Sequence, residues 1–308
     1  MKRFLLTISC AFLALYVINF GIDIYVSHQL QKSRERRYVG WNDIIHRQLS
    51  ADMVIMGSSR AWVQYDPSIL DSILQIKVYN LGIDGSQLNR QIIKYNVYNH
   101  YQRKRPHYII VNIDYCSTLG WTTGYEREQF FPHMPTPYTR NQIKSVEPFS
   151  FAELYIPLYR YTTYKGLFAL LKEIFYDGGL VNGYQGQIRE WDGIAYNDMK
   201  TFHFGKNDST MKMFNEFLAE RHAEGIKVIF CYAPIYIGLT KKVENMQEVY
   251  DTYESLADQY NIPILDYTYS DISKDSTYFY NATHLIKQGA EMFSVQLAND
   301  LDSLGIIQ

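Results

Sequence analysis

Short, unbroken apolar runs alternate along this chain with longer stretches in which apolar residues recur every three or four positions. Such runs, bounded by turn residues, are typical of strands that are buried on both faces of a sheet. The runs that predict strands lie at residues 53–56, 78–81, 108–113, 228–232 and 262–265.

The stretches between these runs carry the three-to-four spacing of amphipathic helices. Alternating strands and helices predict an α/β fold with a parallel five-stranded sheet and helices on both faces, in a three-layer, flavodoxin-like arrangement. The stretches that predict helices are 41–49, 67–75, 87–101, 209–224, 243–260 and 286–301.

The third and fourth predicted strands are too far apart for a simple crossover connection. Residues 117–207 are therefore expected to form an insertion, which is rich in Tyr, Phe, Pro and Gly. Within it, residues 154–174 have a helical pattern with breaks. Long insertions at the carboxyl edge of a sheet often form lids and substrate walls.

The N-terminus begins with an uncharged apolar run, residues 4–22, which at about 19 residues is long enough to cross a bilayer as a helix. A secretory signal has a shorter apolar core and a small-residue cleavage site. We therefore expect residues 1–27 to be an uncleaved signal anchor. The polar residues 28–40 are expected to be a juxtamembrane linker, and residues 41–308 to form the folded domain.

The charges around this run do not fix its orientation. Lys2 and Arg3 favour a cytoplasmic N-terminus, whereas the basic residues after the run favour the opposite. We expect the domain to lie on the extracytoplasmic side, because the chemistry described below suits substrates of the cell envelope.

Composition excludes some functions. The formal net charge is only −2, so the basic face that nucleic-acid binding needs is not indicated. The cysteines at 10, 116 and 231 imply no disulfide framework, and no Cys/His cluster has the spacing of zinc ligands. We expect no metal and no cofactor. The 28 tyrosines suit either a carbohydrate-facing groove or ordinary half-buried surface.

Two short motifs near opposite ends of the domain carry candidate chemistry. Residues 53–56 lead directly into Gly57-Ser58-Ser59-Arg60, so a strand ends where a hydroxyl can be presented at the sheet edge. Asn281-Ala-Thr-His284 precedes the last predicted helix. A serine and a histidine in this setting can act as nucleophile and general base.

Open parallel sheets bind ligands at the carboxyl ends of strands, where the strand order reverses. With the order 2-1-3-4-5, the ends of the first and third strands flank that point. Ser59 follows the first strand, Gly85 the second, and Asp114 the third. The N–H groups of Ser59 and Gly85 are candidates for an oxyanion hole. The other interpretation is that Gly82 and Gly85 are only turn glycines before a helix.

These residues resemble the SGNH (GDSL-like) hydrolase superfamily over residues 50–300, apart from the insertion. The family's four blocks are a Gly-Asp-Ser nucleophile, a glycine, an asparagine, and an Asp-x-x-His pair. Gly57-Ser58-Ser59, Gly85 and Asn281-Ala-Thr-His284 correspond to the first, second and fourth blocks. The pattern is most similar to a membrane-anchored bacterial branch that includes the alginate O-acetylation and lipoteichoic-acid D-alanylation proteins. The resemblance implies Ser59 as nucleophile and His284 as base.

The chain departs from the family at two positions. The third block offers Asp114 in place of asparagine, and a carboxylate repels a developing oxyanion; Asn112 lies deeper on the same strand. Asn281 stands where the family has the aspartate that holds the imidazole in the correct tautomer. Either the site is a slow Ser–His dyad, or another carboxylate, Asp266 or Asp114, takes that role.

Other polar residues have open interpretations. Arg60 either binds an anionic substrate or pairs with a neighbouring acid. Ser58 is expected to be a turn residue, and His203 and His133 are weaker candidates for substrate contact.

The sequence thus predicts a membrane-anchored serine esterase or O-acyltransferase acting on an envelope polysaccharide or an acyl ester. Transfer in place of hydrolysis would need a cleft that excludes water, and a membrane protein that delivers the acyl group. The competing hypothesis is a catalytically inactive protein of the same fold that binds glycan or serves as an accessory in the envelope.

Overall fold

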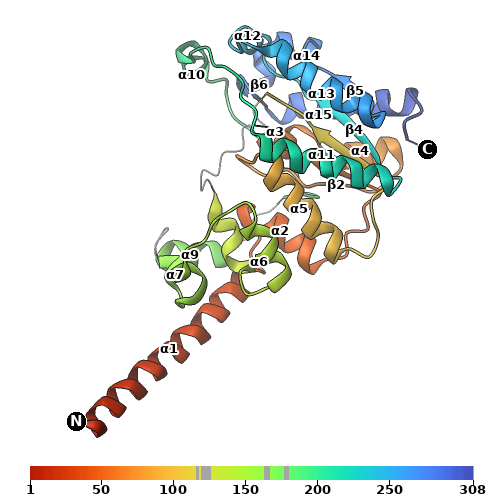
Figure 1. Ribbon diagram of the computed structural model, residues 1–308. Helices are drawn as coiled ribbons and strands as arrows, with labels where there is room; N and C mark the ends of the chain where they lie inside the picture. Colours follow the sequence, from red (N-terminus) through yellow and green to blue (C-terminus); the bar gives the residue numbers. More distant parts are fainter. Residues whose placement is uncertain (116–117, 119–125, 163–166, 177–179, 308) are drawn as a thin grey trace. The chain divides into compact units, whose positions relative to one another are not determined.

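The computed structural model of the protein describes residues 1–115, 118, 126–162, 167–176 and 180–307 (Figure 1). The chain forms two compact units, and each consists of two separate parts of the sequence. Residues 1–47 and 122–179 form unit 1, and residues 48–121 and 180–308 form unit 2.

Unit 2 contains a parallel five-stranded sheet in the order β2-β1-β3-β4-β5, as the sequence predicts. Met53 of β1 pairs with Val78 of β2 and Tyr108 of β3, and the last pair aligns Phe230 of β4 with Ile264 of β5. The strands are β1 (Met53–Met56), β2 (Val78–Asn80), β3 (Tyr108–Asn112), β4 (Lys227–Tyr232) and β5 (Ile264–Asp266).

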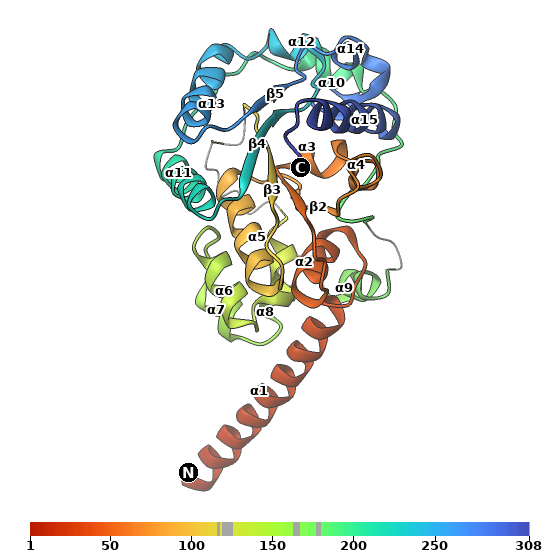
Figure 2. The same ribbon diagram turned by 90° about the vertical axis from the view of Figure 1, so that its right-hand side faces the viewer.

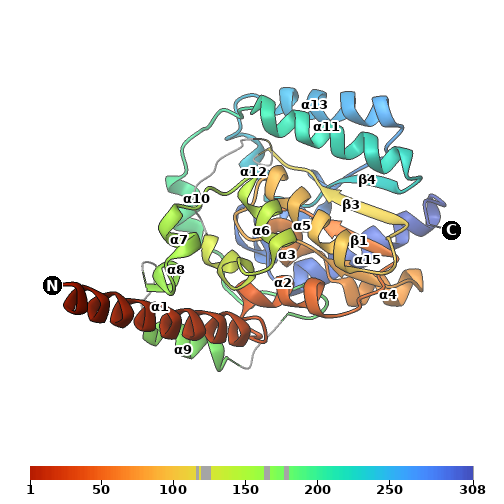
Figure 3. The ribbon, with the colours of Figure 1, turned by 60° about the horizontal axis from the view of Figure 1, so that its bottom comes forward.

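Helices cover both faces of this sheet, which makes unit 2 a three-layer α/β structure consistent with the SGNH hydrolase fold (Figures 2 and 3). One face carries α5 (Leu88–Tyr101), α11 (Asp208–Ala223) and α13 (Met246–Tyr260). The other carries α3 (Ser59–Gln64), α4 (Pro67–Leu74) and α15 (Lys287–Ser303). The short elements of unit 2 are α10 (Gly193–Asp198), α12 (Ile237–Thr240), α14 (Asp271–Lys274), η2 (Ser276–Tyr278) and the antiparallel pair β6 (Phe279–Asn281) and β7 (His284–Leu285).

The core of unit 2 lies between β-strand side chains and the α3–α4–α15 layer. Met53, Ile55 and Ile110 of the sheet pack there with Phe293 and Leu297 of α15, all essentially inaccessible to solvent. Strands β1 and β3 are buried on both faces, which is why their sequences are continuous apolar runs without alternation.

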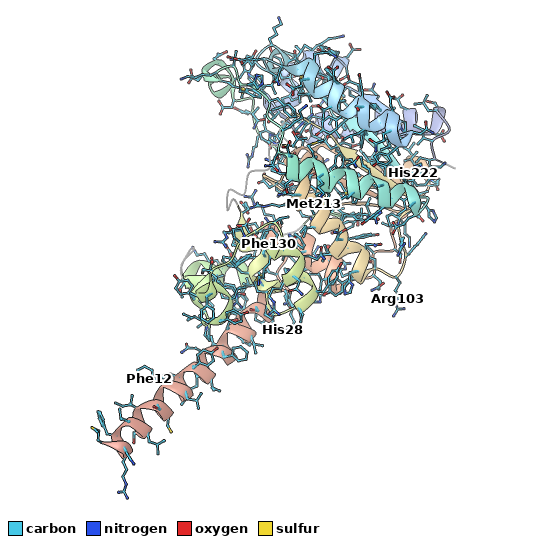
Figure 4. All side chains as sticks on the ribbon, in the orientation of Figure 1. Phe12, His28, Arg103, Phe130, Met213 and His222 are labelled. Atoms are coloured by element: carbon cyan, nitrogen blue, oxygen red, sulfur yellow. The ribbon has the colours of Figure 1, made fainter. Side chains whose placement is uncertain are left out.

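Unit 1 is helical. It is built from α1 (Lys2–Leu30), α2 (Arg36–His46), η1 (Arg127–His133), α6 (Pro137–Lys144), α7 (Phe151–Tyr155), α8 (Tyr159–Thr162) and α9 (Leu167–Ile174). Most of α1 is exposed, and Figure 4 shows side chains such as Phe12 projecting freely from it. By length and composition α1 could cross a membrane, as an anchor or as a signal sequence.

Residues 28–40, which we expected to form a juxtamembrane linker, are mostly helical in the structure. Helix α1 continues to Leu30, and α2 begins at Arg36. Arg37 pairs with Glu128 and Glu173 of the insertion, and the Tyr38 hydroxyl donates to Glu173 over 2.8 Å. The three arginines of this stretch, Arg34, Arg36 and Arg37, are therefore ion-paired within unit 1.

The predicted insertion, 117–207, is also divided. Residues 122–179 belong to unit 1, whereas residues 180–207 belong to unit 2. In the second part, the Asn80 N–H of β2 donates to the Asn182 carbonyl over 2.9 Å. The two parts of the insertion therefore have different structural roles.

Candidate active site

The turn between β1 and α3 presents Ser59. Ser58 caps α3, its Oγ accepting from the Arg60 N–H, and Ser59 is the first helical residue. Gly57 is needed here because a Cβ at this position would lie 2.5 Å from the Ala61 Cβ and 2.9 Å from the Asn112 Cβ. The turn thus brings the start of α3 against β3 and leaves the Ser59 side chain half-buried at the carboxyl edge of the sheet.

His284 reaches Ser59 from the other end of the chain. The Nε2 of His284 lies 2.7 Å from the Ser59 Oγ. His284 and Asn281 are paired across the β6–β7 ladder, and the Asn281 Oδ1 lies 2.9 Å from the Nδ1 of His284. The structure therefore brings together the serine, the histidine and the asparagine that the sequence singles out.

Thr283 fixes the orientation of Asn281, and the sequence analysis missed this residue. The backbone N–H and the hydroxyl of Thr283 both lie 3.0 Å from the Asn281 side-chain oxygen. A backbone N–H can only donate, so the atom that faces it and His284 is the amide oxygen. Its position in the Asn-Ala-Thr-His motif, directly before the histidine, could have identified it.

The tautomer of His284 follows from these contacts. An amide oxygen only accepts, so the Nδ1 that faces it must carry the proton. The Nε2 is then unprotonated and accepts the Ser59 hydroxyl proton. This is the tautomer that a general base needs, and here it is maintained without a carboxylate.

Electrostatics keep the imidazole neutral. Burial, together with the positive charges of Arg60 and Arg189, lowers the pKa of His284 to about 3. Among the described residues, both ring nitrogens are hydrogen-bonded only to Ser59, Asn281 and Thr283, so no carboxylate bonds directly to the imidazole to raise its pKa. His284 is therefore a neutral but weak base across the physiological pH range.

Asp114 is balanced by Arg60. An Arg60 Nη1 lies 3.7 Å from the Asp114 carboxylate, and the Ser58 hydroxyl donates to the same oxygen over 3.2 Å. Arg60 also donates to the Ala233 carbonyl over 2.6 Å. Of the two interpretations of Arg60, the structure thus shows pairing with a neighbouring acid. Asn112 accepts from the Tyr65 hydroxyl at 2.7 Å, deep in the core.

Gly85 lies in the loop after β2, which is connected to the Ser59 turn. The Ile83 N–H donates to the Gly57 carbonyl over 3.1 Å, and the Ser86 hydroxyl approaches the same oxygen. Gly85 is exposed and has a φ of +61°, a backbone conformation that glycine adopts readily. The N–H of Gly82 is already used, because it donates to the Asn80 side chain over 2.8 Å.

Residues 182–192 form a strap along the same edge of the sheet. The strap is tied to α3 by the Gln185 N–H and the Trp62 carbonyl, and to β6 by the Asp192 N–H and the Tyr280 carbonyl. The Tyr280 ring stacks on His284, with centroids 5.3 Å apart and planes 10° apart. The Arg189 guanidinium lies 5.1 Å from the Tyr280 ring centroid. Neither Tyr280 nor Arg189 was identified from sequence.

The remaining candidates lie elsewhere. Asp266 accepts from the Thr268 N–H over 2.8 Å, whereas the Nδ1 of His284 faces Asn281 and Thr283. His203 is exposed beside Asn245 and Glu244, and His133 is buried in unit 1. Cys231 is buried and unpaired, and Cys116 lies outside the described residues. Within the part of the chain that the structure describes, no cluster of His, Cys, Asp or Glu could hold a metal.

No family model and no curated protein matches this sequence. Solved structures with similar folds include a lipase/acylhydrolase from Enterococcus faecalis, at 10% identity and a TM-score of 0.40, covering 82% of this chain and 95% of the other. Another is a provisionally named acylhydrolase from Bacteroides fragilis NCTC 9343, at 15% identity and a TM-score of 0.36; the match covers 80% of this chain and 86% of the other.

Proposed function

We propose that the protein is a serine hydrolase of the SGNH type, an esterase or O-acyltransferase in which Ser59 is the nucleophile and His284 the general base. The 2.7 Å contact between Ser59 Oγ and His284 Nε2, with the opposite ring nitrogen held by Asn281, carries this proposal. It is the arrangement that activates a hydroxyl for attack on a carbonyl.

The reaction would proceed in two half-reactions. Ser59 Oγ attacks the acyl carbonyl as its proton passes to His284 Nε2, and the N–H groups of Ser59 and Gly85 receive the charge of the oxyanion. His284 then protonates the departing alkoxide, which leaves an acyl-serine. In the second half, His284 removes a proton from the acceptor, either water or a sugar hydroxyl, whose oxygen attacks the acyl carbonyl. The bond between the acyl group and Ser59 Oγ then breaks, and His284 returns the proton to Ser59 Oγ.

The setting suggests the substrate class. A membrane anchor at α1 would tether the protein to a membrane, and we propose the extracytoplasmic side and an acylated envelope polysaccharide or acyl ester as substrate. Transfer in place of hydrolysis would require a membrane partner that supplies the acyl group. Arg189 of the strap lies over the Tyr280 ring, which stacks on His284, and together they form a wall that could exclude water.

A second candidate function is glycan binding without catalysis. The observation that favours it is the neutral Asn281 at the position where a carboxylate would stabilise the imidazolium. Reactivity of Ser59 distinguishes the two functions.

The test uses the full-length protein in detergent. It is treated with a fluorophosphonate and its intact mass is recorded beside Ser59→Ala and His284→Ala. Ser58→Ala is the matched control, because it removes the adjacent hydroxyl, which donates to Asp114. We expect one adduct on the wild type and on Ser58→Ala, and none on the other two variants. A folded wild type that takes up no label would favour glycan binding.

A further inference from the structure

The C-terminal part of α1 belongs to the core of unit 1. Val26 and Leu30 are buried in a cluster with Tyr38, Phe131 and Tyr161. Removal of the whole helix would take these side chains out of that core. The C-terminal end of α1 is thus structurally a part of unit 1.

A buried polar clamp fixes α1 at one depth relative to the insertion helices of unit 1. The Arg160 guanidinium donates to the carboxylate of Asp23, and the Leu158 N–H donates to the other oxygen of Asp23 over 2.7 Å. The Ser27 and Tyr161 hydroxyls lie 2.9 Å apart. Helices that are joined by a buried ion pair and hydrogen bonds cannot slide past one another without leaving charges unpaired.

Beside this clamp, unit 1 exposes a group of large apolar and aromatic side chains. Phe151 is 74% exposed and Phe175 is 81% exposed, values that are unusual for phenylalanine in water. We call the group the aromatic face; it consists of Phe151, Tyr155, Ile156, Tyr159, Leu171, Phe175 and Tyr176.

The charged groups among these residues are nearly all neutralised. Glu153 pairs with Arg127 at 2.9 Å, Arg160 with Asp23, and Glu173 with Arg37. Lys172 is exposed, and a lysine beside an apolar surface can extend its ammonium group to the headgroup region. The aromatic face therefore presents apolar area without the charges that a water-facing surface carries.

A hydrogen bond sets the depth of this face along α1. The Tyr16 hydroxyl donates to the Tyr155 carbonyl over 3.0 Å. Tyr16 lies six residues before Ile22, where the uncharged run ends, which corresponds to about 9 Å along a helix. Interfacial helices bury their apolar side about 5–10 Å into the boundary between headgroups and acyl chains. If α1 spans the bilayer, Tyr155 lies about 9 Å inside that boundary, within the depth that interfacial helices reach.

We propose that the aromatic face is embedded in the interface of the same bilayer that α1 spans, so that unit 1 is a membrane-seated module with one spanning helix and one interfacial surface. Lipid is the occupant that the observations favour, because the face is rich in exposed Tyr and Phe and because its residue Tyr155 is hydrogen-bonded to the exposed apolar helix α1. The inference goes beyond the proposed reaction and does not depend on Ser59.

The test measures the environment of single side chains in the full-length protein in lipid nanodiscs. Nitroxide labels are placed at Phe151→Cys and Phe175→Cys in a background with Cys10→Ser and Cys116→Ser. Collision with oxygen, which enriches in lipid, is compared with collision with a water-soluble nickel complex. Val17→Cys on α1 is the lipid control, and Lys212→Cys on the exposed side of α11 is the water control.

We expect both labels on the aromatic face to lose nickel accessibility relative to position 212 and to retain the oxygen accessibility seen at position 17. Nickel accessibility equal to that at position 212 would overturn the proposal. Shielding from both reagents would also overturn it, because it would indicate that a second copy or another protein covers the face. Folding is checked by thermal unfolding; these side chains are exposed, so the substitutions remove no core packing.

Discussion

Replacing Asn281 by aspartate should strengthen the general base without disturbing the site. The Asn281 Oδ1 already accepts from His284 Nδ1, from the Thr283 N–H and from the Thr283 hydroxyl, and an aspartate oxygen can accept the same three bonds. Among the described residues the Asn281 Nδ2 donates no hydrogen bond, and the side chain is half-exposed, so a second carboxylate oxygen can remain hydrated.

The size of the effect follows from Coulomb's law. Opposite unit charges about 4 Å apart interact by about 4 kcal/mol at an effective dielectric constant of about 20, equivalent to about three pKa units. Because the site is partly open, we expect the pKa of His284 to rise from about 3 by roughly one to three units. Acylation should accelerate by about 10- to 1,000-fold.

This gain is smaller than the factor of about 10⁴ that separates aspartate from asparagine in the serine-protease template. There the change also produces the wrong tautomer, whereas here Thr283 keeps the amide oxygen directed at Nδ1. Only the missing charge should therefore be recovered.

The assay is the second-order rate of fluorophosphonate labelling from roughly pH 3 to 8, measured for the wild type, Asn281→Asp and Asn281→Ala. The acid limb of Asn281→Asp should move to higher pH, because a base with a raised pKa is protonated earlier as the pH falls. Asn281→Ala should be slower than the wild type. A slower Asn281→Asp variant, or an unmoved acid limb, would refute the argument that charge alone is missing.

Two further predictions concern unit 1. His133 is fully buried and, among the described residues, neither ring nitrogen has a hydrogen-bond partner, so His133→Leu should stabilise the protein by about 1–3 kcal/mol. Burial lowers the pKa of His133 in the folded protein to about 3, whereas in the unfolded chain it is about 6.5. Below about pH 6.5 the unfolded chain therefore binds a proton that the folded protein does not, and this destabilises the wild type. The gain should therefore grow toward acidic pH in thermal unfolding measurements; an equal gain at all pH values would contradict it. Asp23→Ala leaves Arg160 buried without its anion and should lower the free energy of unfolding by about 3–5 kcal/mol. The double variant Asp23→Leu with Arg160→Met, which replaces the ion pair by two apolar side chains, should recover most of that stability. An unchanged melting temperature for Asp23→Ala would argue against the clamp.

The strands could be predicted because burial on both faces leaves a direct mark in the sequence. Residues 53–56 are reproduced as β1, and 108–113 differs from β3 by one residue. The last strand was expected at 262–265 but spans Ile264–Asp266. Pro263 lacks the N–H that a ladder needs, although its carbonyl accepts from Phe230.

The arrangement of charges could not be predicted in the same way. The sequence left open whether Arg60 binds substrate or pairs with an acid, because Asp114 is distant along the chain and near only in the fold. The same applies to Arg37, whose partners Glu128 and Glu173 belong to the insertion. The local pattern of apolar and polar residues indicates which positions are buried, whereas ion pairs between distant segments depend on the tertiary fold.

Thr283, Tyr280 and Arg189 were missed for a related reason. Their importance comes from contact with His284 or its neighbours, and nothing in their spacing marks it. Ser59 and His284 could be identified because their surroundings in the sequence, a strand end and a turn before a helix, are informative by themselves.

The clamp between Asp23 and Arg160 has a consequence for how the protein is made. The two residues are 137 positions apart in the chain. At a synthesis rate of about 5–20 residues per second, Asp23 emerges about 7–27 s before its partner exists. During that interval α1 is complete and apolar while the core that receives its C-terminal end is missing. If α1 spans the membrane as proposed, its insertion therefore precedes the folding of unit 1 in time.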